Sequence, residues 1–411
     1  MIGYPMRNGE IMIPLMKNTF LHEPDTKKAL AEFILRAERL SLGSECFTFE
    51  KQFAAYQQTN EAILFNSGGS ANLALIQSLK NLALLEDGSK IGFSALTWST
   101  NVMPIIQMNM IPVPLDINIK TLNVSSGTLL ERLKSEKLDA VFLTNALGFT
   151  GDLPHIQKIC KKHDVILIED NCESLGTELQ EGKAGNFGLA ATFSFFVAHH
   201  MSTIEGGMVT TNNRELAEML RIVRANGWDR NLDTTQQTTI RTKFGIESEF
   251  DAKYTFYDLG YNLRPTEITG FLGQYQIQYL EECIDIREKN YLTIEQEVKE
   301  NPDLITPEHD HITRLSNFAF PVICQTPDLR KKYVARFSSS DIEVRPMIAG
   351  NIQRQPFYTK YIQKMFDLPG TEFIHACGFY CGNYPELSGD ELKSIRTCLK
   401  NKEEFQKNTC I

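Results

Sequence analysis

Side chains suited to proton transfer gather in residues 169–207. An apolar run, VILIED, ends in Asp170, and Glu173 follows it in the sequence NCES. A second apolar run, AATFSFF, leads into the pair His199-His200. A carboxylate and an imidazole at the ends of two buried strands are typical of an active-site rim, whereas either one alone equally fits a strand-end cap or a solvated histidine. The combination predicts acid–base chemistry.

A glycine-rich turn lies earlier in the chain. The apolar run AILF (62–65) is followed by NSGGSAN, so Gly69 and Ser70 open a predicted helix directly after a strand. Free N–H groups and the positive end of a helix bind phosphate well. The turn by itself also fits an ordinary helix start, so it predicts a phosphate site only together with other evidence.

Alternating apolar runs and amphipathic stretches must position these groups. The apolar runs are 62–65, 91–96, 111–117, 140–147, 165–170, 190–196 and 207–211, and helix-like segments include 71–83, 129–137 and 155–163. Continuous apolar strands separated by helices predict an α/β fold with a mostly parallel sheet covered on both faces. Ligands of such sheets bind where the strands end.

The second half of the chain has a different pattern. Residues 229–253 are polar and predict a long loop or insertion, and residues 265–298 predict one long helix or two in series. A small α+β region is predicted from the segments 314–323, 328–337 and 341–346 and from a polar helix after Gly389. We therefore expect an N-terminal arm and a large domain in residues 1–260, and a linking helix and a small C-terminal domain in residues 261–411.

Composition excludes several classes of protein. The 411 residues carry 42 Lys and Arg against 51 Asp and Glu, a net charge of −9, which argues against binding to nucleic acid. The nine cysteines are odd in number and scattered, which favours reduced thiols. The sequence has neither a secretory signal pattern nor an apolar run long enough to span a membrane. We expect a cytoplasmic protein with no membrane partner.

Six motifs carry a resemblance to a known family. They are NSGGSAN (66–72), WST (98–100), EDNCESLG (169–176), FSFFVAHHMSTIEGG (193–207), GYNLRPTE (260–267) and VRPMIAGN (344–351). As a set they resemble the DegT/DnrJ/EryC1/StrS sugar aminotransferases and dehydratases, which are fold-type I enzymes dependent on pyridoxal 5′-phosphate (PLP). The resemblance spans residues 14–399 and implies an aspartate-aminotransferase-like fold.

The resemblance implies roles around the cofactor ring. Asp170 matches the carboxylate that pairs with the pyridine nitrogen and keeps the ring protonated as an electron sink. Glu173 lies where many relatives have a glutamine near the ring, and Trp98 matches an aromatic residue that stacks on it.

Other matched residues would bind anions. Gly69, Ser70 and Ser194 match the phosphate site, and Asn262 matches a residue that reaches the phosphate from the neighbouring subunit, which implies a homodimer with shared active sites. Arg264 and Arg345 are candidates for the carboxylate of an amino donor or the diphosphate of a nucleotide sugar, and the sequence leaves open which arginine binds which anion.

His199 is the most informative difference from the aminotransferases. It lies five residues after Ser194, where they have the lysine that binds PLP covalently, and the chain has no lysine between Lys183 and Lys243. The dehydratase branch has the same histidine, which implies non-covalent PLP or pyridoxamine 5′-phosphate (PMP). If PMP condenses with a C4 ketone, the imidazole can remove a C4′ proton and the C3 hydroxyl can leave as water.

The resemblance therefore implies a sugar 3-dehydratase, a lyase. L-Glutamate would convert PLP to PMP, and a nucleotide-linked 4-keto-6-deoxy sugar would yield a 4-keto-3,6-dideoxy sugar and ammonia. Such sugars belong to deoxysugar biosynthesis for bacterial surface polysaccharides, including the O-antigen of lipopolysaccharide.

Three alternatives can be weighed from the sequence. An aminotransferase would need the missing lysine. A non-catalytic nucleotide-sugar-binding relative would have little use for Asp170. The iron–sulfur dehydratases have clustered cysteines, whereas residues 229–282 contain none, so we expect neither an iron–sulfur cluster nor another metal. Asn226 and Ala198 depart from the related dehydratases, and the nucleotide (GDP, CDP or dTDP) and the hexose or heptose nature of the sugar stay open.

Overall fold

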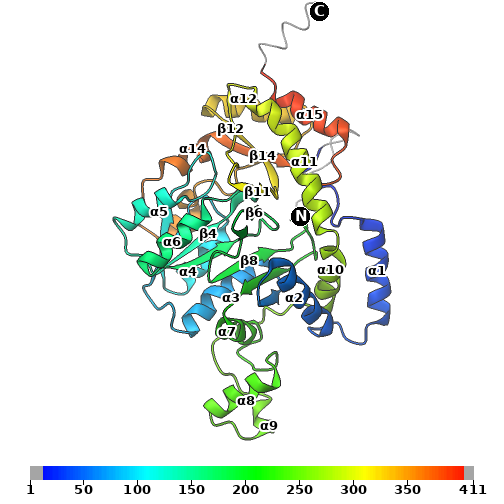
Figure 1. Ribbon diagram of the computed structural model, residues 1–411, viewed down its shortest axis with the longest axis vertical. Coiled ribbons are helices and arrows are strands. Elements are labelled where there is room, and N and C mark those ends of the chain that lie inside the picture. Colours follow the sequence, from blue (N-terminus) through cyan, green and yellow to red (C-terminus); the bar gives the residue numbers. More distant parts are fainter. Residues whose placement is uncertain (1–12, 402–411) are drawn as a thin grey trace, which may run out of the picture.

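A seven-stranded sheet forms the centre of the computed structural model, which describes residues 13–401 (Figure 1). Its strands are β1 (Glu61–Phe65), β2 (Lys90–Ser94), β3 (Ile111–Leu115), β4 (Ala140–Thr144), β5 (Ile166–Asp170), β8 (Ala190–Ser194) and β9 (Gly207–Thr211). The strand order is β1-β9-β8-β5-β4-β2-β3. Strand β9 runs opposite to the other six strands, which are parallel to one another. The prediction of a mostly parallel α/β sheet is confirmed.

Both faces of this sheet are buried, which explains why its strands are continuously apolar. Ile63 and Phe65 of β1 pack in a cluster with α3 and α7, whereas Ala62 and Leu64 pack in a cluster with α2 on the opposite face. The helices around the sheet are α2 (Ser44–Gln57), α3 (Gly68–Asn81), α4 (Met103–Gln107), α5 (Ser126–Leu133), α6 (Leu153–His163) and α7 (Arg214–Arg224).

Two helices in series, α10 (Glu267–Ile277) and α11 (Leu280–Lys299), lead from the large sheet to a smaller one (Figure 1). The smaller sheet is antiparallel in the order β10-β12-β14-β13, with β10 (Leu304–Ile305), β12 (Ala319–Cys324), β13 (Val344–Pro346) and β14 (Gly378–Gly382). Around it lie α12 (Pro327–Ser339), α14 (Pro369–Cys377) and α15 (Gly389–Leu399). The division at residue 260 into two domains stays a prediction.

The remaining elements are short or peripheral. They are α1 (Glu23–Arg36), α13 (Pro356–Tyr361), the 3-10 turns η1 (Ser99–Asn101), η2 (Ala146–Gly148) and η3 (Ile352–Arg354), and a three-stranded sheet of β11 (Ile312–Arg314), β6 (Glu178–Leu179) and β7 (Gly182–Lys183). Within residues 13–401, no helix combines the length and the apolar character that crossing a bilayer requires. Residues 1–12, which make up most of the segment searched for a signal sequence, and Cys410 lie outside the described residues.

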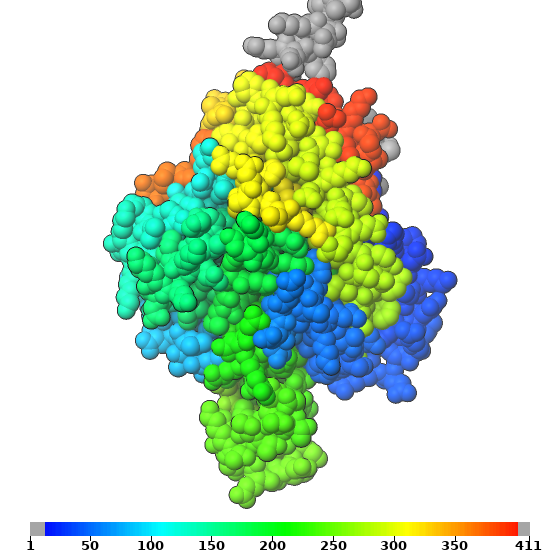
Figure 2. Space-filling model, in the orientation of Figure 1, coloured from blue at the N-terminus to red at the C-terminus, as the bar shows by residue number. Residues whose placement is uncertain are grey.

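Of the two alternatives predicted for residues 229–253, a long loop or an insertion, the long loop is wrong. This region contains α8 (Thr234–Lys243) and α9 (Glu249–Ala252), which project from the body of the molecule (Figures 1 and 2). A capping box starts α8, because the Asp233 side chain accepts from the Gln236 amide and the Gln236 side chain accepts from the Asp233 amide. The loop prediction relied on apolar periodicity, which a helix exposed on most sides does not need.

Candidate active site

A cavity of about 380 Å³ lies at the carboxyl ends of the central strands. Thr144, Asp170 and Ser194 are the last residues of the adjacent parallel strands β4, β5 and β8, and all three line the cavity. Carboxyl ends of parallel strands meet at one edge of a sheet, which is where ligands of such sheets bind. The smaller sheet region closes the opposite wall with Phe318 and Tyr380.

Asp170 is held rigidly at the cavity wall. Its Oδ2 accepts from Asn101 Nδ2 at 2.6 Å and from Asn72 Nδ2 at 3.3 Å, and its Oδ1 accepts from the Cys172 amide at 2.9 Å. Only 4% of Asp170 is exposed, and no cation pairs with it among the residues that the structure describes. The carboxylate is therefore fixed in direction and available to a cationic group in the cavity.

The glycine-rich turn forms the start of α3. Ser67 is the N-cap, and its hydroxyl accepts from the Ser70 amide at 3.0 Å. The amides of Gly68 and Gly69 make no hydrogen bond to any described residue, and both glycines line the cavity. Ser70 is not among the described residues that line the cavity. Two free amides at the positive end of a 14-residue helix form a site for a phosphate.

Close packing makes Gly68 necessary in this turn. A Cβ atom there would lie 2.7 Å from Ser194 Cβ, and a Cβ atom on Gly207 would lie 2.2 Å from the Ser67 carbonyl oxygen. The turn therefore packs directly against the ends of β8 and β9, and this contact brings the Ser194 hydroxyl beside the free amides.

His199 lies in a turn directly after β8. Its amide donates to the Phe196 carbonyl at 2.9 Å, and its ring lies 5.1 Å from that of Phe318. Burial lowers the pKa of His199 to about 4; a hydrogen bond to the Cys172 backbone opposes this shift, and the Arg287 charge adds a smaller lowering contribution. His199 lines the cavity, and its Nδ1 has no hydrogen-bond partner among the described residues. The imidazole is therefore neutral near pH 7 and available as a base.

His200, although adjacent, points elsewhere. Its Nε2 contacts the Ser316 carbonyl at 3.0 Å, and it does not line the described cavity. Burial lowers its pKa well below the usual range. Of the two adjacent histidines, His199 therefore lines the cavity and His200 has a structural role.

Glu173 lines the same cavity. Its Oε2 accepts from the Leu147 amide at 2.9 Å. Burial, with a smaller contribution from the Asp170 charge, raises the pKa of Glu173 to about 7.

Trp98 also lines the cavity and is 59% exposed, so its indole is free to contact a ligand.

Ile348 lies on the wall contributed by the C-terminal region and has φ 48°, an uncommon backbone conformation for a β-branched residue. Such strain is often found where a side chain must point into a binding site.

Three predicted residues do not line the cavity. Asn262 and Arg264 are exposed and contact each other, with Arg264 Nε donating to Asn262 Oδ1 at 3.0 Å. Arg345 on β13, beside the strand that carries Tyr380, forms an ion pair with Glu343. None of the three lines the cavity in the described part of one chain.

Sequence reasoning missed several functional candidates. Asn72 and Asn101 hold Asp170, and Arg287 on α11 donates to the Phe318 carbonyl at 2.8 Å and contacts the His199 carbonyl at 3.4 Å. Asn72 is the last residue of NSGGSAN, and Asn101 directly follows WST. A polar side chain within or beside a recognised motif was the sequence signal that could have identified both residues. No local signal marked Arg287, because its partners are distant in the sequence.

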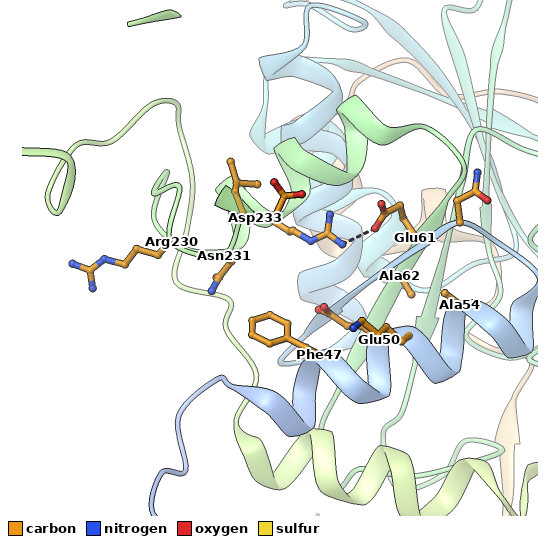
Figure 3. A pocket seen from close by; sticks show the side chains of 12 residues that line it. Phe47, Glu50, Ala54, Glu61, Ala62, Arg230, Asn231 and Asp233 are labelled. Carbon is orange, nitrogen blue, oxygen red and sulfur yellow. Dashed lines mark hydrogen bonds and ion pairs between the residues drawn. The ribbon is translucent and has the colours of Figure 1, made fainter. Parts of the chain in front are cut away.

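A second hollow lies between α2 and the segment that begins the projection (Figure 3). Its carboxylates already have partners: Glu50 pairs with the buried Arg224, and Glu61 pairs with Arg221 at 2.6 Å. It contains no predicted site residue.

The comparisons with known proteins agree with this geometry. A model of the DegT/DnrJ/EryC1/StrS aminotransferase family matches residues 22–400. The fold and the site define a fold-type I PLP-dependent enzyme, and the chain belongs to this family.

Among its relatives is GDP-4-keto-6-deoxy-D-mannose 3-dehydratase of Escherichia coli O55:H7, 31% identical over 95% of this chain and 100% of the relative. A solved GDP-4-keto-6-deoxymannose-3-dehydratase with a trapped PLP-glutamate geminal diamine superimposes with a TM-score of 0.86, at 30% identity, over 94% of this chain and 100% of that one. A mutant of this dehydratase with bound GDP-perosamine gives a TM-score of 0.86 at 31% identity, over 94% and 100% of the two chains.

The residues present fit a pyridoxal phosphate molecule. The free amides of Gly68 and Gly69 suit its phosphate, and Asp170 suits a protonated pyridine nitrogen. No lysine lines the cavity among the described residues, so a covalent link to the protein has no donor there.

Proposed function

We propose that this chain is a nucleotide-sugar 3-dehydratase that uses PLP and PMP without a covalent link and takes its amino group from L-glutamate. The substrate is a nucleotide-linked 4-keto-6-deoxy sugar, and the products are a 4-keto-3,6-dideoxy sugar and ammonia. The observation that carries this proposal is the neutral imidazole of His199, with its Nδ1 free of a partner, in the same cavity as Asp170.

Each residue has a defined task in this reaction. The bound cofactor supplies an electron sink. Asp170 holds the ring nitrogen in its protonated form, and Asn72 and Asn101 hold Asp170. Gly68, Gly69 and Ser194 anchor the phosphate end, and Trp98 covers the ring. His199 accepts a proton and later returns it.

We further propose that the enzyme acts in the cytoplasm as a homodimer. Asn262 and Arg264 are exposed and do not line the cavity of their own chain, which suits a contribution to the partner's site. We assign Arg345, the register partner of Tyr380, to an anionic part of the substrate. The product would enter surface-polysaccharide assembly.

The test is a reaction of the purified protein with PLP, L-glutamate and GDP-4-keto-6-deoxymannose, scored by ammonia release. CDP- and dTDP-linked 4-keto sugars and heptoses should be run in parallel. We expect His199→Asn to lower the rate by about 10²–10⁴-fold, the usual range for loss of a general base.

His200→Asn is the matched control, since it changes the neighbouring imidazole, which points away from the cavity. It should retain most of the activity. Unchanged ammonia release by His199→Asn would exclude His199 as the base, and no release by the wild type with any sugar would reject the proposed function.

A further inference from the structure

The Glu173 carboxyl group has one oxygen free in the cavity. Its Oε2 accepts from the Leu147 amide at 2.9 Å, while Oε1 makes no hydrogen bond to any residue in the range 13–401. A carboxyl group fixed at one oxygen and open at the other is positioned to exchange a proton with a bound molecule. The proton transfers assigned to His199 do not use it.

The neighbouring carboxylate Glu169 provides a contrast. It is fully buried, and both of its oxygens are occupied by the amides of Gly185, Phe187 and Gly188 and by Asn145 Nδ2, at 2.8–3.2 Å. Glu169 therefore has a structural role in holding the loop after β7. Glu173 differs because only one amide binds it.

The surroundings of Glu173 favour its neutral acid form. The titratable groups that act on it or respond to its charge are Asp170, the Cys172 thiol and the Tyr380 hydroxyl. Arg345, whose charge acts on Tyr380, is paired with Glu343. With a pKa raised from 4.5 to about 7, a large fraction of Glu173 retains its proton near neutrality.

We propose that Glu173 is the acid that protonates the hydroxyl group leaving C3 of the sugar. This inference rests on the proposed function. The C3–O bond breaks, its electron pair leaves with the oxygen, and that oxygen takes the proton of Glu173 to form water. The electrons that replace the lost bond come from the C–H bond that His199 breaks.

The two residues together balance the protons. His199 gains one proton and Glu173 loses one, so the net charge of the site does not change. A single imidazole would have to give up its new proton before the hydroxyl could leave, whereas a separate acid allows both transfers to occur together. A proton passing from His199 to Glu173 then resets the pair.

A substrate with a different leaving group at C3 distinguishes an acid role of Glu173 from a positioning role. Fluoride leaves without being protonated, so a GDP-linked 4-keto-6-deoxy sugar with fluorine in place of the C3 hydroxyl does not need the acid. We expect Glu173→Gln to slow water loss by about 10²–10⁴-fold and fluoride loss by less than about tenfold. Equal losses with both sugars, or no loss with the natural sugar, would overturn the proposal.

Two controls keep these outcomes clear. Conversion of PLP to PMP by glutamate, followed by absorbance, involves no leaving hydroxyl and should persist in Glu173→Gln, which shows that the variant folds and binds cofactor. Tyr380→Phe removes the phenolic hydroxyl on the cavity wall and should not reproduce the selective loss. If Tyr380→Phe alone shows that loss, the acid is Tyr380 and the proposal is wrong.

An independent measurement uses the cofactor-free protein. In infrared difference spectra between wild type and Glu173→Gln, a protonated carboxyl band should disappear with a midpoint near pH 7. A wild type that is inactive on every sugar but shows this band would reject the proposed function and leave the protonated state of Glu173 established. Absence of the band at pH 5–6 would overturn the inference directly.

Discussion

At the residue scale, burial acts in opposite directions on the two proton-carrying side chains. It raises the pKa of Glu173 to about 7 and lowers the pKa of His199 to about 4. Each shift favours the neutral form, as expected when a charge loses its hydration. Between these two values the cavity holds a neutral acid and a neutral base, which is the combination that an elimination of water requires.

The Glu173 shift predicts a pH dependence of stability. Because the folded-state pKa lies above the unfolded value of 4.5, the stabilisation is fully present below pH 4.5 and is lost as the pH rises through about 7. A rise of this size corresponds to at most about 3–4 kcal/mol. In urea titrations of the cofactor-free protein, Glu173→Gln should gain stability relative to wild type between pH 5 and pH 8. A constant difference over this range would contradict the raised pKa.

At the element scale, the site depends on contacts among the ends of β8 and β9 and the start of α3. The turn before α3 fits only because Gly68 and Gly207 lack side chains. The Asn72 side chain, one turn into the same helix, then reaches Asp170 at the end of β5. One helix thus positions both the phosphate site and the carboxylate for the ring nitrogen.

Gly68→Ala tests this arrangement. Its Cβ would lie 2.7 Å from Ser194 Cβ, so the turn must shift, at a cost of about 1–3 kcal/mol for overpacking. We expect PLP affinity, measured by absorbance titration, to fall by about tenfold or more. Gly127→Ala in α5 is the control, because the nearest atom to its Cβ is Ser125 Oγ at 3.6 Å and that variant should bind PLP normally.

At the scale of the whole molecule, the cavity is lined by residues from the N-terminal and the C-terminal halves of the chain. The C-terminal region supplies Phe318, Ile348 and Tyr380, and Arg287 joins the His199 turn to that region. The projection that carries α8 and α9 exposes large apolar side chains, with Phe250 79% exposed. Exposed apolar side chains on a projecting segment are compatible with the proposed homodimer.

Shared sites predict complementation between two defective variants. His199→Asn removes the base, and Asn262→Ala removes a proposed contact to the partner's phosphate site. If equal amounts are mixed under conditions that allow subunit exchange, half of the dimers should be mixed, and each should contain one intact site. At limiting PLP we expect about a quarter of the wild-type activity to return. Activity that stays at the level of the separate variants would argue against a shared site.

The sequence alone determined the class of the protein and the order of its central elements. Apolar runs and glycine turns are local signals, so they predicted the strands, the starting position of α3 and the placement of Asp170 and His199 at strand ends. The segment 229–253 was mispredicted because the Asp233–Gln236 capping box provides a start signal without apolar periodicity. The roles of Asn262, Arg264 and Arg345 stay predictions.

Only the tertiary structure decided which groups surround the catalytic candidates. The partners Asn72 and Asp170 are 98 residues apart, and Arg287 and His199 are 88 apart, so their contacts depend on packing that no local pattern encodes. The same holds for Glu173, because a carboxyl group becomes an acid near neutrality only when distant parts of the chain exclude water from it.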